Sequence, residues 1–196
     1  MDTFAHAAAG ILLCSKTGLP GGFTGPVGPD GHRRRLDMTL FAAAAFGTLP
    51  DLCSFAIPLV MRVWHGMPLG KPELHEIPAF VFVNYQLTHS LVIAAIVLLL
   101  LWKFYRPLLL PALAWPLHIL CDIPTHGKSY FATPFLYPIS DYSFDGWGFA
   151  SHFGIVYGYW AVLLLLMVAV IIMRYIGQRR ASAAESSPEP LESDPA

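Results

Sequence analysis

The sequence predicts an all-α protein, a polytopic transmembrane helical bundle with about five membrane segments. Its 196 residues are 55% hydrophobic and only 13% charged, whereas a soluble domain carries about 25% charged residues. In addition, the run 153–173, "FGIVYGYWAVLLLLMVAVIIM", contains no charged residue and is as long as the roughly 20 apolar residues that a membrane-spanning helix needs. Five apolar segments follow from such runs: residues 3–18, 37–62, 84–102, 107–122 and 152–176.

The first two segments differ in how regular a helix they favour. Residues 3–18 lack the basic start of a signal peptide, so we expect a retained first helix. The stretch Ala7–Gly10, "AAAG", offers the small surface that lets membrane helices pack closely. Residues 37–62 are expected to be interrupted by Pro50, Asp51 and Pro58, which lie inside the segment.

The other three segments follow in order. The third opens at "QLTHS", where hydroxyl groups can cap a helix. The fourth is expected to end near Asp122, because Pro124 disfavours helical geometry at the residue before it. The fifth is followed by "ASAAESSPEPLESDPA", which has no apolar periodicity. We therefore predict one transmembrane hydrolase-like domain over residues 1–176 and a disordered cytoplasmic tail over residues 177–196.

Lysine and arginine residues indicate the orientation. If the C-terminus is cytoplasmic, five spans place nine of the 12 Lys and Arg residues inside, including the triplet Arg33–Arg35. Arg62, Lys71 and Lys128 then lie outside. This bias is the one that cytoplasmic loops of membrane proteins show. The N-terminus lies outside on this threading, and moves inside only if the first segment enters the bilayer without crossing it.

Unusual polar residues fall at one level of this threading, near the extracytoplasmic face. They are His6, Asp51, His89, His118, Asp122 and His126. Histidine and aspartate are costly within a membrane, and they usually pair, bind an ion or line a pathway there. His118 and Asp122 are four residues apart, which places them on one helical face with about 5–6 Å between their Cβ atoms.

Several explanations of these residues stay open when each is taken alone. The pair His118 and Asp122 is also typical of a hydrogen bond within one helix. His6 is also explained as a packed structural histidine, and Asp51 as the N-cap of a helix from Leu52 onward.

Together these residues predict a metal site. The expected metal ligands are His6, Asp51, His89, His118 and Asp122. His6, Asp51 and His126 are the candidates for a catalytic role. Mixed nitrogen and oxygen ligands favour zinc, with manganese as the alternative. A divalent metal can activate water for attack on a phosphoester or acyl carbon.

The segment 124–151 is rich in Phe, Tyr and Trp, which favour the headgroup layer of a membrane. We interpret it as an interfacial lid through which a lipid head reaches the site. Asp141 and Asp145 in this loop are expected to be solvated, although ligation stays open, and His152 is a weaker candidate ligand.

At these residues the chain resembles a known family, the bacterial membrane-bound metal-dependent hydrolases, also described as LexA-binding, inner-membrane-associated putative hydrolases. The similar pieces, in order, are "DTFAHAAAG", "GTLPD", "LTHS", "HILCDIPTHG" and "TPFLYPISDYSF". The resemblance implies a shared polar set of His6, Asp51, His89, His118 and Asp122, and a place in the bacterial inner membrane. It also suggests a remote likeness to zinc-dependent phospholipases C. Where family members often read "PDID", this chain has "PDLC".

The function expected from these features is metal-dependent hydrolysis of a phosphoester or lipid-linked substrate near the extracytoplasmic leaflet. The rival is a metal or proton transporter that uses the same intramembrane His and Asp residues. A transport path needs polar groups at successive depths, whereas these residues share one depth. The scattered basic residues exclude a nucleic-acid groove, and the oligomeric state stays open.

Overall fold

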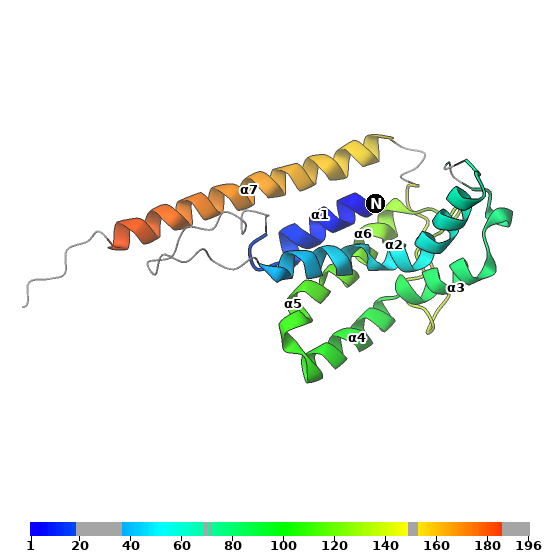
Figure 1. The fold of residues 1–196 in the computed structure, drawn as a ribbon, viewed down its shortest axis with the longest axis horizontal. Helices are drawn as coiled ribbons and strands as arrows, with labels where there is room; N and C mark the ends of the chain where they lie inside the picture. Colours follow the sequence, from blue (N-terminus) through cyan, green and yellow to red (C-terminus); the bar gives the residue numbers. More distant parts are fainter. Residues whose placement is uncertain (19–36, 69, 71, 149–152, 186–196) are drawn as a thin grey trace, which may run out of the picture.

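The computed structural model describes residues 1–18, 37–68, 70, 72–148 and 153–185. The triplet Arg33–Arg35, His152 and residues 186–196 of the predicted tail lie outside the described residues. Every named element of the described chain is a helix, which confirms the all-α class (Figure 1).

Helix α1 covers Thr3–Cys14 and begins at Asp2, whose carboxylate accepts a hydrogen bond from the N–H of Ala5 at 2.9 Å. Such a side chain satisfies one of the free N–H groups at a helix start. With 12 residues, α1 is about 18 Å long, whereas the hydrocarbon core of a bilayer is about 30 Å thick. The first predicted segment is therefore an apolar helix too short for a complete span.

Helix α2 runs without a break from Met38 to Trp64 and contains both Pro50 and Pro58. The prediction that these prolines interrupt the segment is wrong. A proline removes its own N–H from the helical ladder and crowds the carbonyl four residues earlier, but the other hydrogen bonds of the helix can still form. A bilayer offers no water to replace the remaining hydrogen bonds, so a membrane helix tends to continue through a proline.

The third segment is a bent pair, α3 (Ala79–Thr88) and α4 (Leu91–Phe104), whose axes differ by 55°. A short 3₁₀ helix, η2 (Leu74–Glu76), precedes it. Ser90 begins α4, because its hydroxyl accepts hydrogen bonds from two N–H groups of the first turn. His89 therefore lies at the break between the two helices.

The fourth segment consists of η3 (Arg106–Leu108), α5 (Leu109–Ala112) and α6 (Ala114–Thr125). Helix α6 continues past Asp122, so the end predicted for it is wrong. Pro124 lies in the last turn, and the N–H of His126 closes the helix on the carbonyl of Asp122 at 3.0 Å.

Helix α7 (Phe153–Glu185) forms the fifth segment. It extends into residues 177–185, which were expected to belong to the disordered tail. Within the described part of the chain, three helices are long and apolar enough to cross a membrane, and four spans result if the bent pair counts as one. This number is below the five expected, because α1 is short.

Helix α1 lies between α7 on one side and α2 and α6 on the other (Figure 1). Two glycines permit its close approach to α2. A Cβ added to Gly10 would lie 2.7 Å from the carbonyl oxygen of Ala43, and one added to Gly47 would lie 2.7 Å from that of His6. Small residues at this contact therefore bring His6 up to the polar side chains of α2 and α6.

Candidate metal centre

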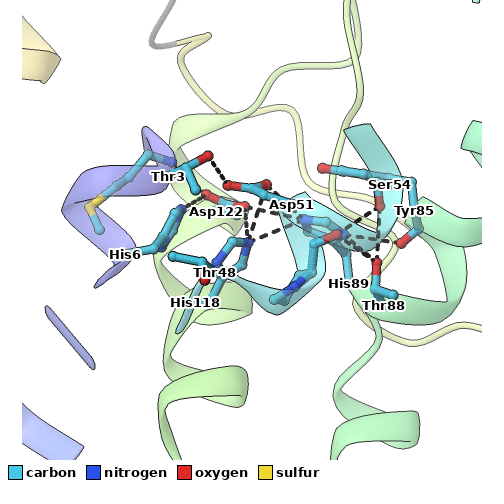
Figure 2. Close-up of polar contacts among 12 residues, drawn as sticks. Thr3, His6, Thr48, Asp51, Ser54, Tyr85, Thr88, His89, His118 and Asp122 are labelled. Carbon is cyan, nitrogen blue, oxygen red and sulfur yellow. Dashed lines mark hydrogen bonds and ion pairs between the residues drawn. The ribbon is translucent and has the colours of Figure 1, made fainter. Parts of the chain in front are cut away.

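Four of the predicted ligands converge in the folded chain, and they come from three parts of it. Asp51 lies in α2, His89 at the break between α3 and α4, and His118 and Asp122 in α6. One ligand atom from each of the four lies within 4.8 Å of the other three. This group, visible in Figure 2, can hold a metal ion.

Five of the six distances among the four ligand atoms fit one ion, and the sixth, between the two carboxylates, is at most 4.8 Å. Oδ2 of Asp122 lies 3.0 Å from Nε2 of His118 and 3.6 Å from Nε2 of His89. The two Nε2 atoms are 3.2 Å apart, and each lies 3.7 Å from Oδ1 of Asp51. Ligands about 2.0–2.1 Å from a zinc ion form a tetrahedron with edges of about 3.3–3.4 Å. The five distances agree with such a tetrahedron to within a few tenths of an ångström.

Hydrogen bonds on the outer side of each imidazole assign its tautomer. Nδ1 of His118 lies 2.7 Å from the carbonyl oxygen of Gly47, and Nδ1 of His89 lies 3.2 Å from that of Tyr85. A carbonyl oxygen only accepts, so both Nδ1 atoms carry the proton and donate. In the neutral ring, each Nε2 then directs a lone pair towards the group's centre. This arrangement is the one that orients histidine ligands of metals.

The group is almost closed to solvent. His89 and Asp122 have no exposed surface and His118 is 1% exposed, whereas the side chain of Asp51 is 15% exposed. The ring of Tyr85 stacks on His89 with centroids 3.8 Å apart and covers that ligand from the side. Asp51 is therefore the most exposed of the four ligands.

His6 lies beside the group of four. Its Nε2 is 2.9 Å from Oδ1 of Asp122, the carboxylate oxygen that is not close to His89 and His118. Its ring stacks on His118 with centroids 3.6 Å apart. The imidazole of His6 can thus orient two ligands, while its predicted role as a ligand or base stays a prediction.

His126 follows α6 and also approaches Asp122. Its Nδ1 lies 3.4 Å from Oδ1 of that carboxylate and 3.2 Å from the Asp122 carbonyl oxygen. The α-amino group of Met1 lies 2.5 Å from the same Oδ1 and 2.8 Å from Oγ1 of Thr125. Nothing in the sequence pattern pointed to Met1 or Thr125, because only the position of α1 brings the Met1 amino group to Asp122 and Thr125 of α6.

The structure excludes the alternatives that the sequence left open for Asp51 and His118. Asp51 lies in the middle of α2 and caps no helix. The His118–Asp122 contact within α6 does exist, but Oδ2 of Asp122 accepts no hydrogen bond. A local hydrogen bond therefore does not account for the pair.

The first turn of α1 supplies further polar contacts that sequence reasoning missed. Oγ1 of Thr3 donates to Oδ2 of Asp51 at 2.6 Å, as Figure 2 shows. Asp2 accepts hydrogen bonds from Tyr159 at 2.6 Å and Trp160 at 3.0 Å in α7. Burial acts to raise the pKa of Asp2, but these hydrogen bonds and the one from Ala5 outweigh it and hold that pKa below its ordinary value. The piece "DTFAHAAAG" contains Asp2 and Thr3, but it did not reveal their partners.

The remaining acidic candidates lie away from the group. Asp141 and Asp145 are exposed. Oδ1 of Asp145 accepts a hydrogen bond from the backbone N–H of Lys128 at 2.7 Å. This carboxylate therefore connects the two ends of the loop after α6. Within the described residues, the group of four is the one cluster found with the spacing of metal ligands.

Comparison with known proteins identifies the family of the chain. No curated protein and no solved structure matches the chain. A family model, described as YdjM inner membrane protein, matches residues 1–186. This is the family of membrane-bound metal-dependent hydrolases that the sequence resembles. Since the match covers nearly the whole chain, the protein belongs to the YdjM inner membrane protein family.

Proposed function

We propose that this protein is a metal-dependent hydrolase that acts on a phosphoester or a lipid-linked substrate near the extracytoplasmic leaflet. One observation carries the proposal: four electron-pair donors converge in a nearly closed site. In the neutral imidazoles the Nδ1 hydrogen bonds leave both Nε2 atoms without protons, and the carboxylates of Asp51 and Asp122 face them. A single proton can bridge only one pair of these atoms, whereas a divalent cation can be coordinated by all four.

The donor set decides which ion fits. Two imidazole nitrogens and two carboxylate oxygens suit zinc, and manganese is the alternative; calcium prefers sites built of oxygens only. Asp51, His89, His118 and Asp122 would hold the ion. Such an ion supplies Lewis acidity, which polarises a phosphoryl or acyl oxygen.

The chain's own residues then have separate tasks. Gly47 and Tyr85 fix the two imidazoles through their carbonyl oxygens. Asp51, the one partly exposed ligand, marks the side from which a substrate enters. His6 holds the Asp122 carboxylate by its other oxygen.

A lipid-linked substrate is supported by the surface around the loop after α6. This loop is tied back to the end of the helix, because the N–H of Gly146 donates to the carbonyl of His126 at 3.0 Å. It exposes several large apolar or amphipathic side chains: Ile139, Tyr142, Phe144 and Trp147. Aromatic residues with one polar atom favour the headgroup layer. We infer that the loop lies there, with the C-terminus of the chain on the cytoplasmic side.

The test uses His118→Ala, with His75→Ala as a matched control in the exposed helix η2. Metal content is measured on purified protein, and hydrolysis on bis(p-nitrophenyl) phosphate and on phospholipid vesicles. We expect the wild type and His75→Ala to hold about one divalent ion per chain and to hydrolyse a phosphodiester. His118→Ala should lose the ion and the hydrolysis together.

Two results would contradict the proposal. If His118→Ala kept metal at the wild-type level and only lost about 2–4 kcal/mol of stability, His118 would be a packing residue. If the wild type bound the ion, cleaved no phosphodiester and moved metal across vesicle membranes, the transporter would be the correct reading.

A further inference from the structure

The first turn of α1 is joined to three other helices by short polar contacts. Thr3 donates to Asp51 in α2 at 2.6 Å. His6 contacts Asp122 in α6 at 2.9 Å. On the opposite side, Oδ2 of Asp2 accepts from both Tyr159 and Trp160 of α7. One helical turn thus contacts both carboxylate ligands of the metal centre and is itself held by α7.

Helix α7 has little other attachment to the protein. Only 6% of its most apolar window is buried inside the described structure. Among the side chains of α7 that the structure describes, Leu163 is the one that is buried, and it packs with Met1, Ala5 and Ala9 of the same N-terminal region. Apolar contacts of this kind allow sliding, whereas two donors directed at one carboxylate oxygen fix the relative position of two helices.

We propose that the first turn of α1 closes the metal centre, and that Asp2 is the positioning residue through which α7 keeps this turn in place. The first claim, that this turn closes the metal centre, rests on the function proposed above. The link between Asp2 and α7 does not, so the two can fail separately. Removing the link should let the turn open more often, which exposes the ligands without changing them.

Asp2→Asn is the discriminating variant. Asparagine caps a helix as well as aspartate does, so Oδ1 can still accept from the N–H of Ala5. Its amide nitrogen, in place of Oδ2, would meet two donors, Tyr159 and Trp160. The cap is kept and the link is lost. Tyr159→Phe removes one donor, and Tyr157→Phe is the control, because Tyr157 is 72% exposed on the same helix.

The native Cys121 reports on the position of α1 without any metal. This thiol is half-buried against the core formed by Met1, Ala5 and Ala9. With Cys14 and Cys53 replaced by alanine, its rate of alkylation measures how often the turn lifts. Hydrogen bonds to a charged group are strong enough that Asp2→Asn should raise this rate by about tenfold, with no effect of Tyr157→Phe.

A second readout tests whether the turn closes the metal centre. Release of bound zinc to a chelator should also be about tenfold faster in Asp2→Asn, at unchanged metal stoichiometry. The double variant with Tyr159→Phe should be no faster than Asp2→Asn alone, since both remove one link. If Asp2→Asn does not fold, Trp160→Phe provides the same test, because Trp160 is 40% exposed.

The outcomes separate the two proposals. Equal alkylation of Cys121 in Asp2→Asn and the wild type overturns the link. Faster alkylation with unchanged zinc release overturns the closure of the metal centre by this turn. A wild type that binds no metal overturns the proposed function, and the alkylation rates then still decide whether α7 holds α1.

Discussion

Replacing Gly47 by alanine tests the helix contact on which the position of His6 depends. The added Cβ would lie 2.7 Å from the carbonyl oxygen of His6, which is 0.7 Å short of the 3.4 Å where ordinary contact begins. The nearest atoms belong to a backbone, so α1 as a whole must move. Overpacking of this kind costs about 1–3 kcal/mol, while removing a glycine from a helix gains about 1 kcal/mol.

The matched control is Gly158→Ala in α7, where no atom lies within 4 Å of the added Cβ. Both variants share the gain in helix propensity, so the difference between them is the steric cost alone. For a chain of this size, about 1–3 kcal/mol corresponds to about 2–12 °C in Tm.

The assay is thermal unfolding of the two variants in the same detergent, at equal protein and metal concentrations. We expect Gly47→Ala to melt below Gly158→Ala, and His6 to move away from Asp122 together with α1. A Gly47→Ala protein that melts at or above the temperature of Gly158→Ala would refute the close α1–α2 packing and the position that it gives to His6.

Two further predictions concern the outer contacts and the topology. Thr88→Val removes a hydroxyl 3.1 Å from Nδ1 of His89. Loss of a hydrogen-bond partner of a metal ligand weakens metal binding by about 10–100-fold. We expect about tenfold here, because Nδ1 of His89 keeps its contact with the carbonyl of Tyr85. Thr48→Val, whose hydroxyl bonds only its own helix, should leave the affinity unchanged in the same titration. In a background without native cysteines, a cysteine in the 103–106 turn should be protected from an impermeant thiol reagent in intact cells, and one at 128–130 should react. The reverse labelling would invert the orientation.

Much of the fold follows from local sequence. A run such as 153–173 can satisfy its backbone only as a helix in a bilayer, so its helical structure needs no tertiary information. The proximity of His118 and Asp122 is equally local, because residues four apart share one face of a helix. Both were predictable, and so was the convergence of Asp51 and His89 with this pair, since the basic residues place all four at one depth.

Helix boundaries were less accessible. The local rule for proline predicted an interruption of α2 and an early end of α6, and both predictions are wrong. A proline removes one hydrogen bond, but breaking the helix in a membrane would leave several backbone groups without partners. The environment therefore outweighs the local preference.

The sequence by itself determined that apolar helices form and which residue types lie at the polar level, because periodicity and charge act over one or two helical turns. Only the tertiary structure decided the state and the partners of those residues. The hydrogen bond from Nδ1 of His118 to the carbonyl of Gly47, and the contacts of α1 with Asp51 and Asp122, join residues far apart in the chain. They depend on interhelical distances that the packing of small residues sets to within a few tenths of an ångström, and no local pattern records such distances.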